Sequence, residues 1–329
     1  MLIPPKYRLT PKISGLLSSI EASRQVIESI SIPPEVETNI RRQSTLKSSL
    51  YSARIEGNTL VLDELDNLSS SDKKKLEVLN ILKSLNWIHD KKKKKITLAD
   101  ILMLHKITMV KLIDSENLGK FRKNMEAIFN SAGIAIYMPP PPRFVRSLMQ
   151  KLLRYAGSPK EKFIPIRACL AHYSFEKIHP FLDGSGRVGR LIIQQILSMS
   201  SYGMKGILSL EEYLDNHRSQ YYRMLEEPEK DATDYLEFML EAIAETAKKA
   251  KETVLEKQKP QIEDFLLPRR AEILRLINEQ KIINFEQIKR RFSKVNERTL
   301  RYDLKKLQEQ GLIRKLGTTR GVYYQINEI

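Results

Sequence analysis

A chain of 329 residues with 41% hydrophobic and 29% charged residues has room for about two domains and is neither disordered nor fibrous. Its 56 Lys and Arg against 40 Asp and Glu give a formal net charge of +16, which favours a polyanionic partner such as nucleic acid, a nucleotide or a membrane surface. The single cysteine, Cys169, excludes an intramolecular disulfide, and the lack of an apolar leader or a membrane-length apolar run predicts a cytoplasmic protein without a membrane partner.

The N-terminal region, residues 1–95, is expected to be helical, with one helix at about 35–57. Apolar side chains recur in that stretch at spacings of three and four residues, as they do on one face of an α-helix. The pattern stops at Gly57, and glycine ends helices well because it tolerates a positive φ.

A second helical domain is expected over residues 96–258. Just before this domain, the serines Ser69–Ser71 resemble an N-cap for a helix that follows them and ends before residue 96. Thr97 with Asp100 has the spacing of a capping box at the first helix of the domain. Helical spacing then recurs in the segments 145–155, 166–178, 188–199, 210–226 and 235–257. The bulk of the chain is therefore predicted to be all-helical.

One short stretch breaks the helical pattern. Residues Phe129–Tyr137 favour β structure on both sides of a Ser-Ala-Gly turn, and the prolines Pro139–Pro142 follow them. Because proline can continue neither a helix nor a central strand, we expect a short, exposed β-hairpin.

A distinct last segment is expected after a linker at 259–268, which Pro260 and Pro268 bracket. Residues 269–329 show three helical stretches and then two β-like stretches around a Gly-Thr-Thr-Arg-Gly turn, an order that resembles a winged helix-turn-helix domain. This segment holds 15 Lys and Arg against 7 Asp and Glu, so half of the net charge lies in less than a fifth of the chain.

The densest run of reactive residue types is HPFLDGSGRVGR, from His179 to Arg190. A Gly-Ser-Gly turn that opens a helix directs unpaired backbone N–H groups and the positive end of the helix dipole at one point, which suits a phosphate. Arg187 and Arg190 share a helix face, where guanidinium groups can bind several phosphate oxygens. Asp183 supplies a carboxylate of the kind that holds Mg²⁺ between phosphates, and His179 can take a proton near pH 7.

This run resembles the signature of the Fic (Fic/Doc) family, His-x-Phe-x-Asp/Glu-Gly-Asn-Gly/Lys-Arg-x-x-Arg. The resemblance implies a mostly helical Fic-type bundle with a β-hairpin flap, and the transfer of AMP from ATP to a Tyr, Ser or Thr hydroxyl of a target protein, with release of pyrophosphate. By the same resemblance His179 would be the base, Asp183 the Mg²⁺ ligand and Phe181 the anchor of the loop in the core. The ATP-binding residues would be Gly184, Ser185, Gly186, Arg187, Gly189 and Arg190, with Asn216 near the adenine base of the nucleotide.

One position departs from the family's signature, and the resemblance also extends to the hairpin. Ser185 stands where the family has Asn, and its shorter hydroxyl lacks the fixed geometry of an amide, which changes how a phosphate would be held. The hairpin near Phe129–Tyr137 is similar to the family's flap, which would dock the target protein by strand addition; a plain surface hairpin is the alternative.

Upstream of these residues, Ser52-Ala-Arg-Ile-Glu56-Gly57 matches the family's inhibitory pattern, Ser/Thr-x-x-x-Glu-Gly/Asn. The four-residue spacing places Ser52 and Glu56 on one helix face. The resemblance implies that Glu56 pairs with Arg190, occupies the guanidinium that the γ-phosphate needs and so inhibits the enzyme. A solvated carboxylate at a helix end is the alternative.

The winged-helix segment suggests DNA as a further partner, because the third helix of that fold enters the major groove and the wing contacts the backbone or the minor groove. The candidate contacts are Arg298, Arg301 and Lys305 on the exposed face of that helix, and Arg320 on the wing. Winged helices also dock proteins or dimerise, so a protein partner and a homodimer remain alternatives.

Three functions are therefore weighed. The first is an autoinhibited protein adenylyltransferase that depends on ATP and Mg²⁺, which the intact His179, Asp183 and two arginines favour. The second is a DNA-binding regulator whose Fic core senses a nucleotide or is inactive. The third is a relative that transfers another phosphate-containing group, because the cradle indicates phosphates better than it indicates which bond is cut.

Overall fold

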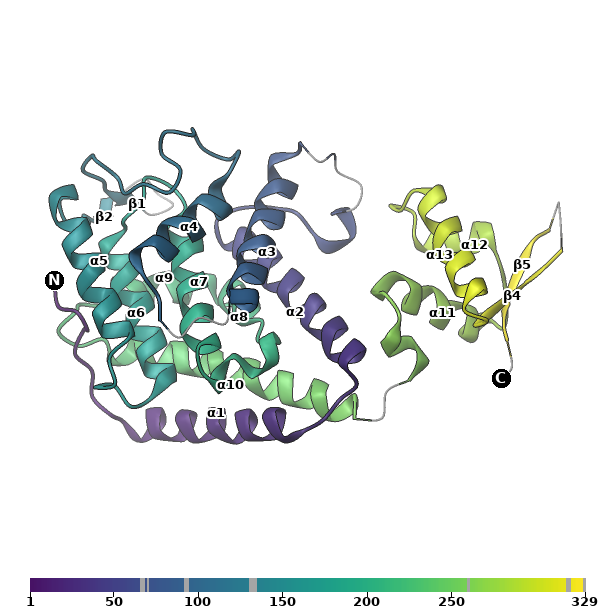
Figure 1. Ribbon diagram of the computed structural model, residues 1–329, viewed down its shortest axis with the longest axis horizontal. Helices are drawn as coiled ribbons and strands as arrows, with labels where there is room; N and C mark the ends of the chain where they lie inside the picture. The colour runs from purple at the N-terminus through teal and green to yellow at the C-terminus, as the bar shows by residue number, and fades with distance from the viewer. Residues whose placement is uncertain are drawn as a thin grey trace. The chain divides into compact units, whose positions relative to one another are not determined.

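The computed structural model describes residues 1–65, 69, 71–91, 95–129, 135–258, 261–317 and 321–327. Over these residues the chain is mostly helical, with one two-stranded and one three-stranded sheet, which confirms the predicted fold class (Figure 1). The chain divides into two compact units, one of residues 1–31, 41–60 and 70–254, the other of residues 32–40, 61–69 and 255–329.

The first unit is a helical bundle. Its helices are α1 (Pro11–Ser29), most of α2 (Pro34–Ile55), α3 (Lys73–Lys91), α4 (Leu98–Met109), α5 (Pro142–Ala156), α6 (Ile164–Ile178), α7 (Ser185–Ser198), α8 (Leu210–Asn216), α9 (Arg218–Glu226) and α10 (Thr233–Glu256), with a 3₁₀ turn η2 (Ser201–Gly206). None of the described helices has both the length and the apolar character needed to cross a bilayer.

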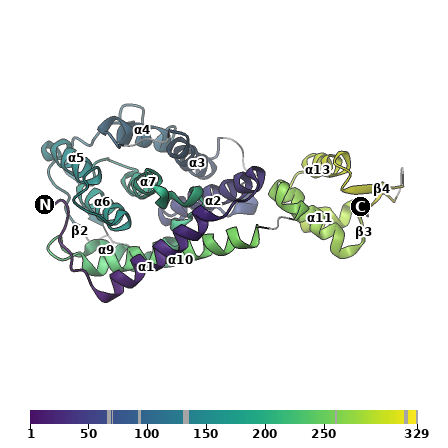
Figure 2. The same cartoon turned by 60° about the horizontal axis from the view of Figure 1, so that its bottom comes forward.

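The centre of this unit is the pair α6 and α7. Both helices are buried over most of their length and pack against each other, while α5 packs on α6 and α3 and α4 pack on α7. The helix α1 runs along α10 in both views (Figures 1 and 2), where Thr10 Oγ1 donates a 2.6 Å hydrogen bond to Glu237 and Lys12 pairs with Glu241 at 2.9 Å. The loop between α6 and α7 is thus held by the best-packed part of the bundle.

Local sequence signals mark several helix ends. The helix α2 ends at Ile55, just before Gly57 with φ of 98°, in agreement with the predicted stop. Thr97 and Asp100 form the predicted capping box of α4. The start of α3 differs from the prediction, because Asp72, after the serine run, accepts the backbone N–H groups of Lys74 and Lys75.

The predicted hairpin contains two short antiparallel strands, β1 (Ile128–Phe129) and β2 (Ala135–Tyr137), with Ile128 opposite Tyr137. Its Ser-Ala-Gly turn lies outside the described residues. Pro142 begins α5, consistent with the ability of proline to occupy the first turn of a helix.

The second unit contains the first turns of α2, the 3₁₀ turn η1 (Leu62–Glu64) and the C-terminal elements. The C-terminal elements are η3 (Ile262–Phe265), α11 (Pro268–Gln280), β3 (Ile282–Asn284), α12 (Phe285–Arg291), α13 (Glu297–Glu309), β4 (Ile313–Leu316) and β5 (Tyr323–Ile326). The strands form an antiparallel sheet in the order β3-β5-β4. The three helices bury one apolar core with this sheet, which includes Ile273, Ile288, Leu304 and Tyr324. Strand β3 was not predicted, and a 3₁₀ turn occupies part of the predicted linker.

Candidate active site

The backbone between α6 and α7 has two left-handed positions. His179 caps the C-terminus of α6 with φ of 45°, and Gly184 caps the N-terminus of α7 with φ of 84°. The first helical hydrogen bond of α7 runs from Val188 N to Gly184 O, so the N–H groups before it point out of the helix towards the loop. The loop therefore presents an imidazole beside a helix N-terminus, an arrangement that attracts anions.

The loop is closed from the inside by Phe181 and Ser185. The Phe181 ring is fully buried, and its backbone N–H donates to Ser185 Oγ at 3.1 Å while that hydroxyl lies 3.2 Å from Phe181 O. Ser185 is buried, so its hydroxyl bonds the loop itself, and its backbone N–H is the group it can offer to a phosphate. This is a different use of the side chain from the phosphate contact expected from sequence.

A histidine from α4 supports the same loop. The His105 ring stacks on Phe181 at 3.8 Å between centroids, its Nδ1 accepts from Gly119 N at 2.9 Å, and its Nε2 lies 3.0 Å from Asp183 O. With Nδ1 accepting, the neutral ring carries its hydrogen on Nε2 and donates to Asp183. Burial lowers the pKa of His105, which keeps it in this neutral form.

A buried arginine holds the start of the loop. Arg122 has a side chain with 0% exposure, and its guanidinium donates to the carbonyl oxygens of His179 at 2.7 Å, Asn124 at 2.9 Å and Pro140 at 2.5 Å. The backbone N–H of Arg122 also donates to Pro180 O at 2.9 Å. These bonds hold the backbone of His179 in its left-handed conformation.

Arg190 is buried and points at the end of α2. Its Nε donates to Ser52 Oγ at 3.0 Å, and its Nη2 donates to Ser52 O at 2.8 Å and to Glu56 Oε1 at 2.9 Å. Gly186 makes this approach possible, since a Cβ at that position would lie 2.6 Å from Glu56 Oε1. Gly189 faces α6: a Cβ there would meet Glu176 and His172, so this glycine lets the two helices pack closely, and its part in ATP binding stays a prediction.

The opposite charges of Glu56 and Arg190 stabilise each other. Burial opposes the ionisation of Glu56, but the positive charges of Arg190 and Arg187 outweigh it and hold the pKa of Glu56 below its usual range. Burial likewise opposes the charge on Arg190, while Glu56 raises the pKa of the guanidinium. His179 has a pKa lowered mainly by burial, so its ring is neutral at pH 7 and able to accept a proton.

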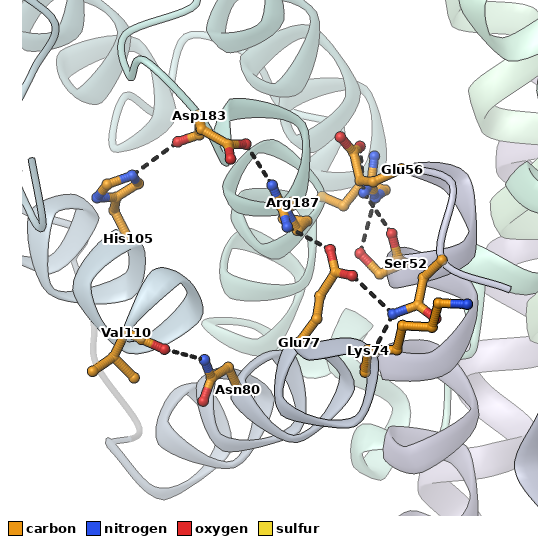
Figure 3. Close-up of polar contacts among 11 residues, drawn as sticks. Ser52, Glu56, Lys74, Glu77, Asn80, His105, Val110, Asp183 and Arg187 are labelled. Carbon is orange, nitrogen blue, oxygen red and sulfur yellow. Dashed lines mark hydrogen bonds and ion pairs between the residues drawn. The ribbon is translucent and has the colours of Figure 1, made fainter. Parts of the chain in front are cut away.

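Arg187 contacts two carboxylates. Its Nη2 pairs with Asp183 Oδ1 at 2.6 Å, and its Nη1 pairs with Glu77 of α3 (Figure 3). The Asp183 side chain is 54% exposed, which leaves it accessible to solvent ions. A single accessible carboxylate suits Mg²⁺, which is held in proteins by one or two carboxylates, water and the phosphates of a substrate.

A second polar cluster lies behind Arg190. His172 Nε2 lies 2.8 Å from Tyr221 Oη, and His172 Nδ1 lies 3.6 Å from Glu176 Oε1. Burial raises the pKa of Glu176 to about 8 and lowers the pKa of His172 to about 3, so a protonated Glu176 faces a neutral imidazole at neutral pH.

Helices α8 and α9 hold α2 in place. Arg54 pairs with Asp215 at 3.2 Å, Tyr222 Oη donates to Ile55 O at 3.1 Å, and Ser48 Oγ donates to Glu211 at 2.7 Å. Asn216, expected near the adenine, ends α8 with an exposed side chain. These bonds from α8 and α9 therefore hold the segment of α2 that carries Ser52 and Glu56, the two residues that contact Arg190.

The flap strand β2 is attached to α6. Tyr137 Oη donates to Lys177 O at 2.9 Å, and Lys177 Nζ lies 4.6 Å from the centre of the Tyr137 ring. Because Lys177 is two residues before His179, this contact places Tyr137 of β2 near the start of the loop.

The predicted recognition helix is α13, and the three basic residues assigned to it are all exposed. Arg301 lies over the Phe285 ring at 3.9 Å and 3.8 Å from Glu297, and Lys305 lies 3.8 Å from Glu309. Arg298 is in the first turn of the helix. Arg320 lies outside the described residues.

The sequence did not reveal four residues of this site: Glu77, His105, Arg122 and Glu176. Glu77 contacts Arg187, His105 and Arg122 contact the loop, and Glu176 faces His172. Each is a common residue type, and its role depends on a partner that is distant in the sequence, so no local pattern marked it.

Two protein families match parts of this chain. Residues 95–197 match the Fic/DOC family, and residues 269–320 match the DeoR-like helix-turn-helix domain. The curated proteins named protein adenylyltransferase Fic from Drosophila mojavensis and Drosophila erecta are each 28% identical over 243 residues, which is 70% of this chain and 46% of each relative. The chain thus spans about half the length of these relatives.

Solved structures resemble the fold. A Fic family protein from Desulfovibrio desulfuricans superposes with a TM-score of 0.67 at 24% identity and covers 98% of both chains. A Fic domain containing signaling protein from Bacteroides thetaiotaomicron superposes with a TM-score of 0.56 at 18% identity, over 73% of this chain and 97% of that one. At these identities the likeness concerns the fold.

Proposed function

This chain carries a Fic/DOC family domain, and from that premise we propose that it is an enzyme that transfers AMP from ATP to a hydroxyl side chain of a target protein. The observation that carries the proposal is the convergence of His179, Asp183, Arg187 and Arg190 on one loop and one helix N-terminus. Relatives named protein adenylyltransferase support the same reaction class.

The triphosphate would lie against the N-terminus of α7. The backbone N–H groups of Gly184, Ser185 and Gly186 offer hydrogen bonds there, and the helix dipole adds to the attraction. Arg187 and Arg190 would contact the outer phosphates once their carboxylate partners withdraw. Asp183 would hold Mg²⁺, which supplies charge neutralisation between the phosphates.

His179 would act as the general base. Its neutral ring accepts the proton of the target hydroxyl as that oxygen bonds to the α-phosphorus. The bond between the α-phosphorus and the oxygen bridging to the β-phosphate then breaks, and pyrophosphate leaves with the electron pair. Arg122 and Phe181 hold the loop that positions the base.

Autoinhibition by Glu56 belongs to the same proposal. Its ion pair occupies Arg190, and Ser52 accepts two further hydrogen bonds from the same guanidinium. A γ-phosphate that cannot reach Arg190 leaves the α-phosphate misaligned for attack, since small errors in position cost large factors in rate.

The experiment compares ATP labelled at the α-phosphate with ATP labelled at the γ-phosphate, incubated with wild type, Glu56→Gly and Glu56→Gly/His179→Ala proteins. We expect α-label in the protein or in an added lysate, more of it with Glu56→Gly, and none with the double variant. Incorporation of γ-label alone would indicate phosphoryl transfer instead. Equal α-label in wild type and Glu56→Gly would refute the inhibitory role.

The flap is proposed to dock the target protein. Strands β1 and β2 form a two-stranded ribbon, and a ribbon with an open edge can pair with an extended segment. The contact of Tyr137 with Lys177 would bring that segment close to His179.

A DNA-binding role is proposed for the C-terminal domain, because it matches a DeoR-like helix-turn-helix domain and carries a strong excess of Lys and Arg. Helix α13 would enter the major groove with its N-terminal turn, which carries Arg298, towards the DNA. Gel-shift measurements with random duplex DNA at rising salt test this role, because phosphate contacts weaken as salt increases.

A further inference from the structure

Both arginines that follow the loop are held by a carboxylate from another helix. Glu56, just after the last residue of α2, contacts Arg190. Glu77 in the second turn of α3 contacts Arg187 (Figure 3). The family's inhibitory pattern accounts for the first pair only. Glu77 lies outside that pattern and has a side chain that is 14% exposed.

Each terminal nitrogen of the Arg187 guanidinium forms an ion pair with a carboxylate. Nη1 pairs with Glu77 Oε1 and Nη2 pairs with Asp183 Oδ1 at 2.6 Å, and the arginine side chain is 9% exposed. Two carboxylates around one guanidinium leave a net negative charge beside the helix N-terminus. A triphosphate that approached this point would meet the like charge of Glu77 in addition to that of Asp183.

Glu77 is also connected to the end of α2. Asn58, two residues after Glu56, donates from Nδ2 to Glu77 Oε2 at 2.8 Å and to Lys74 O at 3.0 Å. The Asn58 carbonyl oxygen accepts from Leu60 N at 2.9 Å, which fixes the orientation of the amide. A shift of the α2 end that removes Glu56 from Arg190 therefore also pulls Asn58 away from Glu77.

We propose that Glu77 is a second inhibitory carboxylate, which withholds Arg187 from the triphosphate as Glu56 withholds Arg190, and that Asn58 couples the release of the two. This inference rests on the proposed function, because it concerns the same nucleotide site. The opposite role would be a support that aims Arg187 at the phosphates. The two roles differ in sign: removing the charge of an inhibitor strengthens nucleotide binding, whereas removing a support weakens it.

The test measures binding of α,β-methylene ATP, which cannot donate AMP, to full-length protein in the presence of Mg²⁺. Glu56→Gly and Glu56→Gly/Glu77→Gln proteins are compared by calorimetry. We expect the second to bind about three- to tenfold more tightly, the effect of removing one like charge beside the phosphates in a partly screened site. The matched control is Glu56→Gly/Glu237→Gln, which loses the same charge at the contact of α1 with α10 and should bind as Glu56→Gly does.

Weaker binding by the Glu77→Gln protein, or binding equal to that of the Glu237→Gln control, overturns the inference. Should Glu77→Gln unfold at low temperature, Glu56→Gly/Glu77→Ala replaces it. That change removes the same carboxylate and leaves the arginines intact, and it should tighten binding of the analogue relative to Glu56→Gly; unchanged or weaker binding overturns the inference. Transfer of α-label from ATP by the Glu56→Gly protein is measured separately. A protein that binds the analogue but transfers no AMP refutes the proposed function. The ratio of the binding constants still decides the role of Glu77.

Discussion

Arg122 donates a hydrogen bond of 2.7 Å from its Nε to the carbonyl oxygen of His179, and no part of its side chain is exposed. The same guanidinium reaches the carbonyl of Pro140 at the base of the flap. One buried residue therefore connects the proposed base to the segment proposed to dock the target, and it gives a left-handed, non-glycine backbone a fixed geometry.

We expect Arg122→Lys to impair the rate of transfer more than nucleotide binding. Lysine keeps the charge but cannot span the carbonyls of His179, Asn124 and Pro140 at once. In the Glu56→Gly protein, the rate should fall by about 10- to 100-fold through misplacement of His179. The free energy of unfolding should fall by about 1–3 kcal/mol because buried carbonyls lose their donors.

Initial rates of α-label transfer, dissociation constants for ATP and urea unfolding measure these three effects. Arg143→Lys is the matched control, because Arg143 is exposed on α5. A fall in ATP affinity as large as the fall in rate would contradict a positioning role for Arg122.

Ser52→Ala should release the inhibition in part. The change removes the acceptor of the Arg190 Nε hydrogen bond but keeps Glu56 and the Ser52 carbonyl in place. We expect a rise in AMP transfer smaller than that produced by Glu56→Gly, and a loss of about 1 kcal/mol in the free energy of unfolding from the unpaired donor.

The comparison for this prediction is Ser49→Ala, which removes another buried hydroxyl of α2 whose bond goes to Leu46 O. Labelling assays and thermal unfolding of both variants suffice. An equal rise in transfer for Ser49→Ala would mean that any weakening of α2 activates the enzyme and that the Ser52 contact has no special part.

Glu176 should make stability fall as pH rises. Its pKa is raised by burial from 4.5 to about 8, so between these values the unfolded chain releases a proton that the folded protein keeps. Folding becomes less favourable over that window. Glu176→Gln, which imitates the protonated form, should therefore be more stable than wild type by about 1–3 kcal/mol at pH 8 and nearly equal to it at pH 4.5.

Urea unfolding of both proteins at several pH values checks this effect. Glu237→Gln again provides a control, since Glu237 lies at the partly exposed contact with α1. A Glu176→Gln protein that is less stable than wild type at pH 8 would show that the carboxylate is ionised and used by Arg190.

Arg298→Ala should weaken binding to random duplex DNA. Arg298 is exposed in the first turn of α13, whereas Arg301 and Lys305 lie near Glu297 and Glu309. Loss of one phosphate contact should lower the slope of log affinity against log salt by about 1. Replacing Arg301 or Lys305 should have a smaller effect.

Fluorescence anisotropy at several salt concentrations measures these slopes, with Arg275→Ala on α11 as the control for an exposed arginine outside α13. Wild-type protein that shows no salt-dependent affinity for DNA would contradict the DNA-binding role and favour a docking module.

The features that the sequence predicted are those whose signal is local. The run from His179 to Arg190 is contiguous, so the order of residues alone places a base, a carboxylate and two arginines around one helix start. The helix stop before Gly57 and the capping box at Thr97 are likewise decided within a few residues, because backbone hydrogen bonds at helix ends are satisfied by near neighbours.

Strand β3 escaped prediction for the converse reason. Its three residues pair with β5, about 40 positions later in the chain, and a strand this short has no alternating pattern of its own. The sequence likewise did not show that the Ser185 hydroxyl closes the loop on Phe181, because that contact depends on how the loop folds.

The sequence by itself determined which residues can carry the chemistry: one histidine, one aspartate and two arginines within twelve positions, with Ser52 and Glu56 matching an inhibitory pattern. Only the tertiary structure decided what surrounds them. Glu77 reaches Arg187 and Arg122 reaches His179 across long separations in the chain. Such contacts depend on how α3, α6 and α7 pack, and packing is set by the sum of many apolar contacts that no single short pattern records.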